Sequence, residues 1–105
     1  MWNNVKALSE QKLKTLVKNE KPFEIIVVTD DNLVVENSKK QSRPIQRKQI
    51  EDSWQHLLKN GELKRFDVEN HYSPRNSAYV VAIIAQLSNV QVTKKPITLH
   101  LGANY

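Results

Sequence analysis

Positive charge crowds into one short stretch of the chain that contains no carboxylate. Residues 37–48 hold five Lys or Arg residues, with Gln41, Ser42 and Gln46 between them. Cations held close together bind a phosphate backbone by displacing its counterions, and the interleaved side chains are donors for phosphates or base edges. The pattern indicates nucleic-acid binding, and a loop that is only solvated is the alternative. The predicted phosphate contacts are Lys39, Lys40, Arg43, Arg47 and Lys48.

A second polar stretch, residues 71–77, comes directly before an apolar segment. Its serine-proline pair is typical of a helix N-terminus, where backbone N–H groups attract phosphate. At that position Arg75 and Asn76 are placed to reach base edges, and Tyr72 to stack on a base. A simple helix cap is the alternative, because the segment that follows is apolar and typical of a core helix.

The last third of the chain, residues 70–105, contains no acid at all. Besides Arg75 it carries Lys94 and Lys95, and it contributes much of the net charge of +5. A local field depends on where charges cluster more than on their total. We therefore add both lysines to the predicted nucleic-acid-binding residues. The sequence does not choose between DNA and RNA.

Neither catalysis nor metal binding is indicated by a motif. There is no cysteine, and His56, His71 and His100 are scattered without a ligand spacing to any carboxylate. Gly61 and Gly102 are the only glycines, so a glycine-rich phosphate loop is absent. We expect no enzyme activity, no cofactor and no metal.

Two enzymatic alternatives stay open. His71, Tyr72 and Arg75 together supply the groups of a metal-independent ribonuclease. Carboxylates in the first third of the chain are the parts that a metal-dependent nuclease needs. These acids are Glu24, Asp30, Asp31 and Glu36, and Lys39 completes the set.

A protein-interaction module, an adaptor or an inhibitor, is the competing non-enzymatic interpretation. It requires only an exposed apolar patch or a free sheet edge, which either end of the chain or the edge strands of small hairpins would supply. A homodimer is also left open. The absence of cysteine and of any long apolar run favours a soluble, cytoplasmic protein with no membrane partner.

The composition is that of one globular domain. A chain of 105 residues with 39% apolar side chains suffices for a single core, whereas two domains would each be too small. We divide this domain into a helix plus hairpin, a basic loop and a helical unit that ends in a hairpin. The three parts are residues 1–36, 37–43 and 44–105.

Hydrophobic spacing predicts an α+β fold. The first part of the chain should form a helix, a β-hairpin and an exposed loop, over residues 4–19, 23–36 and 37–42. The remainder should form a helix that stops at Asn60-Gly61, a short helix, a longer helix and a second hairpin. The last three cover residues 62–69, 73–87 and 90–101. A buried strand is the alternative for the apolar run 78–85.

The element order from residue 44 onward, three helices followed by a hairpin, resembles that of a winged helix-turn-helix module. The resemblance covers about 60 residues and is one of order alone, with no sequence motif behind it. It implies a nucleic-acid-binding scaffold.

Overall fold

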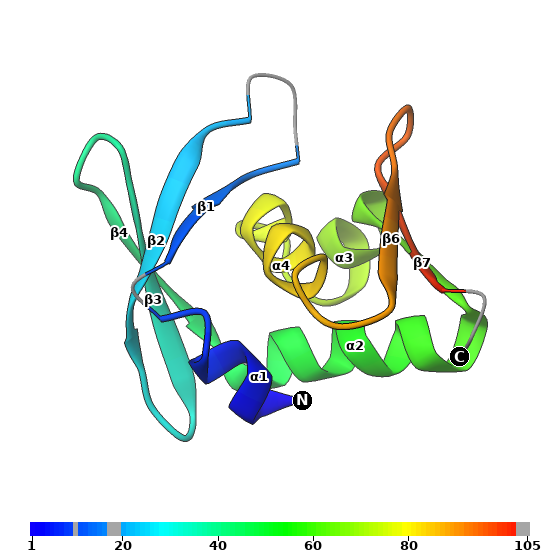
Figure 1. The fold of residues 1–105 in the computed structure, drawn as a ribbon, viewed down its shortest axis with the longest axis horizontal. Coiled ribbons are helices and arrows are strands. Elements are labelled where there is room, and N and C mark those ends of the chain that lie inside the picture. The colour runs from blue at the N-terminus through cyan, green and yellow to red at the C-terminus, as the bar shows by residue number, and fades with distance from the viewer. Residues whose placement is uncertain (10, 17–19, 103–105) are drawn as a thin grey trace.

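The computed structural model describes residues 1–9, 11–16 and 20–102. Within this part the fold is mixed α+β, with four helices and two antiparallel sheets packed into a compact globule (Figure 1). The first sheet has the strand order β1-β2-β3-β4 and the second the order β5-β7-β6. The predicted fold class is therefore confirmed.

The N-terminal half builds the first sheet. Its elements are α1 (Trp2–Lys6), β1 (Lys12–Lys14), β2 (Pro22–Val28), β3 (Asn32–Asn37) and β4 (Ser42–Gln46). Alternating apolar residues turn one face of the sheet to the core, as the cross-strand pairs Ile25–Val35 and Leu33–Ile45 show. A bulge between Ile25 and Val27 breaks this alternation and leaves Ile26 and Val27 exposed. The predicted first hairpin is confirmed.

The predicted long N-terminal helix over residues 4–19 is wrong. The helix ends at Lys6, and β1 follows with Leu13 buried between exposed Lys12 and Lys14. The sequence around Leu13 has a period of two, which fits a strand, and pairing with β2 outweighs the weak helical pattern. Residues 10 and 17–19 of the predicted helix lie outside the described part of the chain.

The predicted exposed loop is confirmed for residues 38–41, whereas the basic loop predicted over residues 37–43 ends earlier than expected, because β4 begins at Ser42. Asn37 ends β3 and Ser42 begins β4, so the segment is the tip of a hairpin. Beyond it, Arg43 lies on β4 while Arg47 and Lys48 lie on a helix. The basic residues that are neighbours in the sequence therefore sit on three different elements.

The C-terminal half contains the other three helices and the second sheet. Its elements are α2 (Arg47–Asn60), β5 (Glu62–Lys64), α3 (Arg65–His71), α4 (Ser77–Ile84), β6 (Val90–Thr93) and β7 (Thr98–Leu101). The α2 helix is confirmed. Gly61 ends it with a left-handed φ of 77°, and the Gly61 backbone N–H donates a hydrogen bond to Leu57 O at 2.8 Å. The second hairpin is likewise confirmed.

The predicted short helix over residues 62–69 begins three residues later than expected. Leu63 pairs with Leu99 in the second sheet, so residues 62–64 form β5 before α3 starts. Both leucines are fully buried. Because residues 62–64 pair with β7, they form a strand, and α3 begins only at Arg65.

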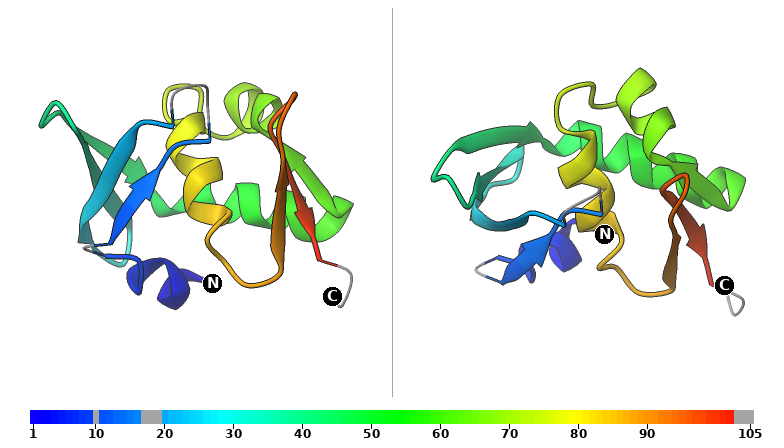
Figure 2. Two further views of the ribbon diagram at one scale, coloured as in Figure 1. Left: turned by 45° about the horizontal axis from the view of Figure 1, so that its top comes forward. Right: turned by 90° about the horizontal axis from the view of Figure 1, so that it is seen from above.

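The predicted fourth helix exists, but it is shorter than 73–87 and its predicted Ser73 cap is wrong. Asn76 is the N-cap residue, and Ser73 Oγ instead donates to Gln49 Oε1 at 3.1 Å. The residues from Val80 to Ile84 are all buried. Figure 1 and both views of Figure 2 show the reason, because α4 lies between the first sheet and the unit made of α3, β6 and β7.

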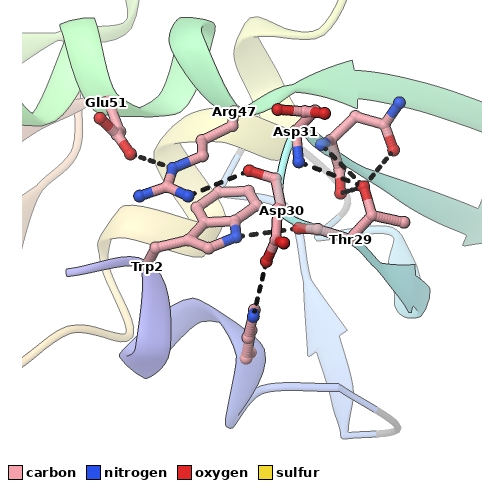
Figure 3. Close-up of polar contacts among 8 residues, drawn as sticks. Trp2, Thr29, Asp30, Asp31, Arg47 and Glu51 are labelled. Atoms are coloured by element: carbon pink, nitrogen blue, oxygen red, sulfur yellow. Dashed lines mark hydrogen bonds and ion pairs between the residues drawn. The ribbon is translucent and has the colours of Figure 1, made fainter.

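The N-terminal helix is fastened to the first sheet and to α2 by one polar cluster (Figure 3). Trp2 Nε1 donates to Thr29 O at 3.0 Å, and the Arg47 guanidinium lies 5.2 Å from the centre of the Trp2 ring. Arg47 also donates to Asp30 O at 3.0 Å and pairs with Glu51. These contacts fix the start of α2 against the turn between β2 and β3.

The helices in the described part of the chain are all too short or too polar to cross a membrane.

Candidate nucleic-acid interface

A groove of about 510 Å³ separates the tip of the β3–β4 hairpin from the start of α4. Four segments of the chain meet there: the end of β1, the start of β2, the hairpin and the segment around residue 75. Its lining residues are Thr15, Lys21, Asn37, Ser38, Lys39, Gln41, Arg43, Arg75, Ala78 and Tyr79. We call it the basic groove.

Three of the predicted binding residues meet in the basic groove. Lys39 lies on the hairpin tip and Arg75 in the connection between α3 and α4. Arg43 stands opposite Val35 on the neighbouring strand, and since Val35 is buried, Arg43 points to the same inner side of the sheet. Lys21, which precedes β2, is the fourth cation.

The hairpin tip that carries Lys39 is shaped by Asn37. The Asn37 Oδ1 atom accepts hydrogen bonds from the backbone N–H groups of Lys39 and Gln41, both at 3.0 Å. Its Nδ2 donates to Gln41 Oε1 at 3.2 Å, and Lys40 takes a left-handed φ of 63° to close the turn. The turn therefore holds Lys39 at the rim of the basic groove.

The electrostatics of the basic groove are one-sided. Among the residues that the structure describes, its lining contains four Lys or Arg residues and no Asp or Glu. None of the four cations forms an ion pair with any acid in the described part of the chain. Cations without carboxylate partners are available to an anionic ligand.

Tyr79 supplies an aromatic side chain to the same lining as these cations. It is half-buried on α4 and meets the Phe23 ring edge-on, with 5.1 Å between ring centroids and 72° between ring planes. Phe23 is itself buried, so it supports the tyrosine from beneath. The ring is thus fixed in the wall of the groove.

Other predicted cations have partners within the protein. Lys40 Nζ lies 3.6 Å from Glu36 Oε1, beside a separate hollow of about 230 Å³ that Glu24 and Glu36 also line. Lys48 Nζ donates to Asp52 Oδ2 at 2.6 Å, and this hydrogen bond raises the pKa of the lysine. The Arg47 guanidinium contacts Trp2, the Asp30 carbonyl oxygen and Glu51. The structure does not bring these three residues into the basic groove.

Lys94 and Lys95 lie far along the chain, between β6 and β7. Lys94 Nζ donates to Glu20 Oε1 at 3.0 Å, and this hydrogen bond lowers the pKa of the glutamate. Lys95 is exposed with a left-handed φ of 75°. Neither residue lines the basic groove.

Tyr72 and Asn76 have structural partners of their own. The Tyr72 hydroxyl lies 2.8 Å from His56 Nδ1, and the two rings meet edge-on. Asn76 Nδ2 donates to Pro44 O at 3.4 Å, while its Oδ1 is buried without a hydrogen-bond partner in the described residues. Both residues hold elements together and neither lines the basic groove.

The contacts of Arg47 predict that its removal lowers stability and leaves nucleic-acid binding nearly unchanged. Arg47→Ala removes the stacking on Trp2 and the bond to Asp30 O, so it should lower the free energy of unfolding by roughly 1–2 kcal/mol. Nucleic-acid affinity should stay within about twofold of wild type, because no binding contact is lost. Urea unfolding and fluorescence anisotropy measure the two effects. A large loss of nucleic-acid affinity in a folded Arg47→Ala variant would mean that Arg47 contacts the nucleic acid directly.

Sequence reasoning missed Lys21 and Tyr79. Lys21 is one of several lysines near the N-terminus and carries no signal of its own. Tyr79 stands in an apolar run, which predicts a core residue, and Arg75 lies before α4 begins, so helical spacing does not link the two.

The comparisons add no relative. No protein-family model, curated protein or solved structure matches this chain. Within residues 1–9, 11–16 and 20–102, no group of three or more His, Cys, Asp or Glu residues is arranged to hold a metal ion.

Proposed function

We propose that this protein is a small, non-catalytic nucleic-acid-binding protein that contacts phosphates in the basic groove. The observation that carries the proposal is the meeting of Lys21, Lys39, Arg43 and Arg75 in a groove without carboxylates. Phosphate binding draws most of its affinity from such clustered cations, which release the counterions of the backbone. We further propose that it acts in the cytoplasm.

The arrangement of the C-terminal half supports a winged-helix-like scaffold. From residue 47 the order is helix, strand, helix, helix and hairpin, and β5 joins the hairpin in the order β5-β7-β6. In such modules the last helix before the hairpin reads the major groove. Here that helix, α4, is apolar and buried, so we assign the nucleic-acid contacts to the basic groove and none to the outer face of α4.

We expect the groove to bind phosphate without catalysing a reaction. General acid-base catalysis needs a group within hydrogen-bond reach of the reacting phosphate. The described lining residues include no histidine and no carboxylate, and the Tyr72 hydroxyl lies in hydrogen-bond contact with His56 outside the groove.

Salt dependence tests the proposed function. With four phosphate contacts, log Kobs against log salt should fall with a slope of about −3, which is about 60-fold between 50 and 200 mM. Fluorescence anisotropy with labelled DNA and RNA measures it, and the recovered strands should be intact with or without Mg²⁺. A flat titration would remove the electrostatic mechanism. Cleavage that disappears in His71→Ala would contradict the non-catalytic assignment.

A protein-interaction module is the second candidate function. The bulge in β2 exposes Ile26 and Val27, at 40% and 46% of their surface, side by side on the outer face of the first sheet. Exposed apolar groups that lie together mark contact surfaces more often than single ones do. This candidate, including a homodimer, becomes the leading one if no nucleic acid binds at low salt.

A further inference from the structure

We infer that the basic groove takes a single, unpaired nucleic-acid strand and that Tyr79 stacks on one of its bases. The inference rests on the nucleic-acid-binding function proposed above and names the kind of strand that the groove selects.

The size and shape of the groove favour a single strand. Its volume of about 510 Å³ falls in the range of pockets that enclose a small ligand, and so fits one or two nucleotides. A duplex carries its phosphates on the outside of a wide cylinder. It would therefore reach the rim, at Lys39, but would leave the floor of the groove empty.

The position of Tyr79 gives an unpaired base a contact that a paired base lacks. Its ring lies in the same lining as Lys21, Arg43 and Arg75, so a strand whose phosphates meet these cations brings its bases to the ring. A positively charged groove combined with an aromatic side chain on which a base stacks is the arrangement by which single strands are held without sequence preference. Phe23 fixes the Tyr79 ring from beneath, which lowers the entropy lost on stacking.

The burial of α4 removes the usual element for reading a duplex. An exposed helix or ribbon must enter the major groove, and α4 has the first sheet on one side and α3 with the second hairpin on the other. Its only residues that line the basic groove are Ala78 and Tyr79. We therefore assign strand binding to the basic groove itself.

Three labelled DNA probes of about 12 nucleotides test the inference. They are a mixed-sequence single strand, the same strand as a duplex, and an abasic single strand with the same number of phosphates. At about 50 mM salt the single strand should bind about tenfold or more tightly than the other two, because only it offers both phosphates and free bases. Equal or tighter binding of the duplex, or equal binding of the abasic strand, overturns the inference.

Two variants assign the preference to Tyr79. Tyr79→Leu should bind the single strand only as well as wild type binds the abasic strand, whereas Tyr79→Phe should keep the preference. If Tyr79→Leu fails to fold, the abasic probe on wild-type protein still decides the question. The proposed function fails separately, by the absence of binding to all three probes. Preference for a single strand that persists in folded Tyr79→Leu overturns the role of the tyrosine.

Discussion

Charge reversal at the two arginines of the basic groove should lower nucleic-acid affinity by at least about 100-fold at low salt. The variant Arg43→Glu/Arg75→Glu removes two charge-assisted hydrogen bonds, each contributing about 1.5–3 kcal/mol, and adds repulsion between carboxylate and phosphate. Both arginines are exposed and neither has an ion-pair partner in the described residues, so folding should be preserved. Anisotropy titration and far-UV circular dichroism measure the two outcomes.

A control variant separates the groove from the total charge. Lys59→Glu/Lys95→Glu makes the same change in net charge, from +5 to +1, at exposed positions outside the groove. It should lower affinity by only a few-fold, through the long-range field. Equal losses in both double variants would mean that the protein binds through its overall charge and has no defined site.

Truncation of a buried α4 side chain should have the largest effect on stability. Ile83 is fully buried in the core that α4 shares with the first sheet, so Ile83→Ala leaves a cavity and should cost about 2–5 kcal/mol of unfolding free energy. That is a large part of the roughly 5–15 kcal/mol typical of a domain. Guanidinium unfolding followed by tryptophan fluorescence measures it. Gln86→Ala, at an exposed position just after the helix, should cost well under 1 kcal/mol.

The two tryptophans test whether both halves unfold together in this variant. Trp2 reports on α1 and the first sheet, and Trp54 reports on α2. Because α4 packs against both halves, Ile83→Ala should shift the transitions of Trp2→Phe and Trp54→Phe backgrounds by the same amount. A shift of only one transition would show that the halves unfold independently.

Local patterns in the sequence were sufficient for elements with one strong period. The helix around Ile50 and Leu57 and both hairpins follow from apolar spacing and from turn residues such as Gly61. The helix predicted near Leu13 is wrong because a leucine between Lys12 and Lys14 fits a helix face or an edge strand equally well. Pairing with β2 determines that this segment is a strand, and local residue spacing contains no information about that pairing.

The candidate site was predicted only in part for a similar reason. Clustering along the chain grouped Arg43 with Arg47, but a strand and a helix start direct them to different places. Acids one helical turn away neutralise Arg47 and Lys48, a spacing of four residues that the sequence does contain. The convergence of Lys21 with Arg75 depends on tertiary packing and has no local signal.

The central position of α4 also determines where the chain can be divided or fused to another protein. The first 46 residues leave the inner face of a sheet uncovered, and the remainder leaves an apolar helix uncovered, so neither piece buries its own hydrophobic surface. Each piece is therefore expected to be unfit for transplantation into another protein as an independent cassette. Grafting or recombination should keep both pieces together, whereas insertions are best placed in the exposed turn at Lys95, remote from the shared helix.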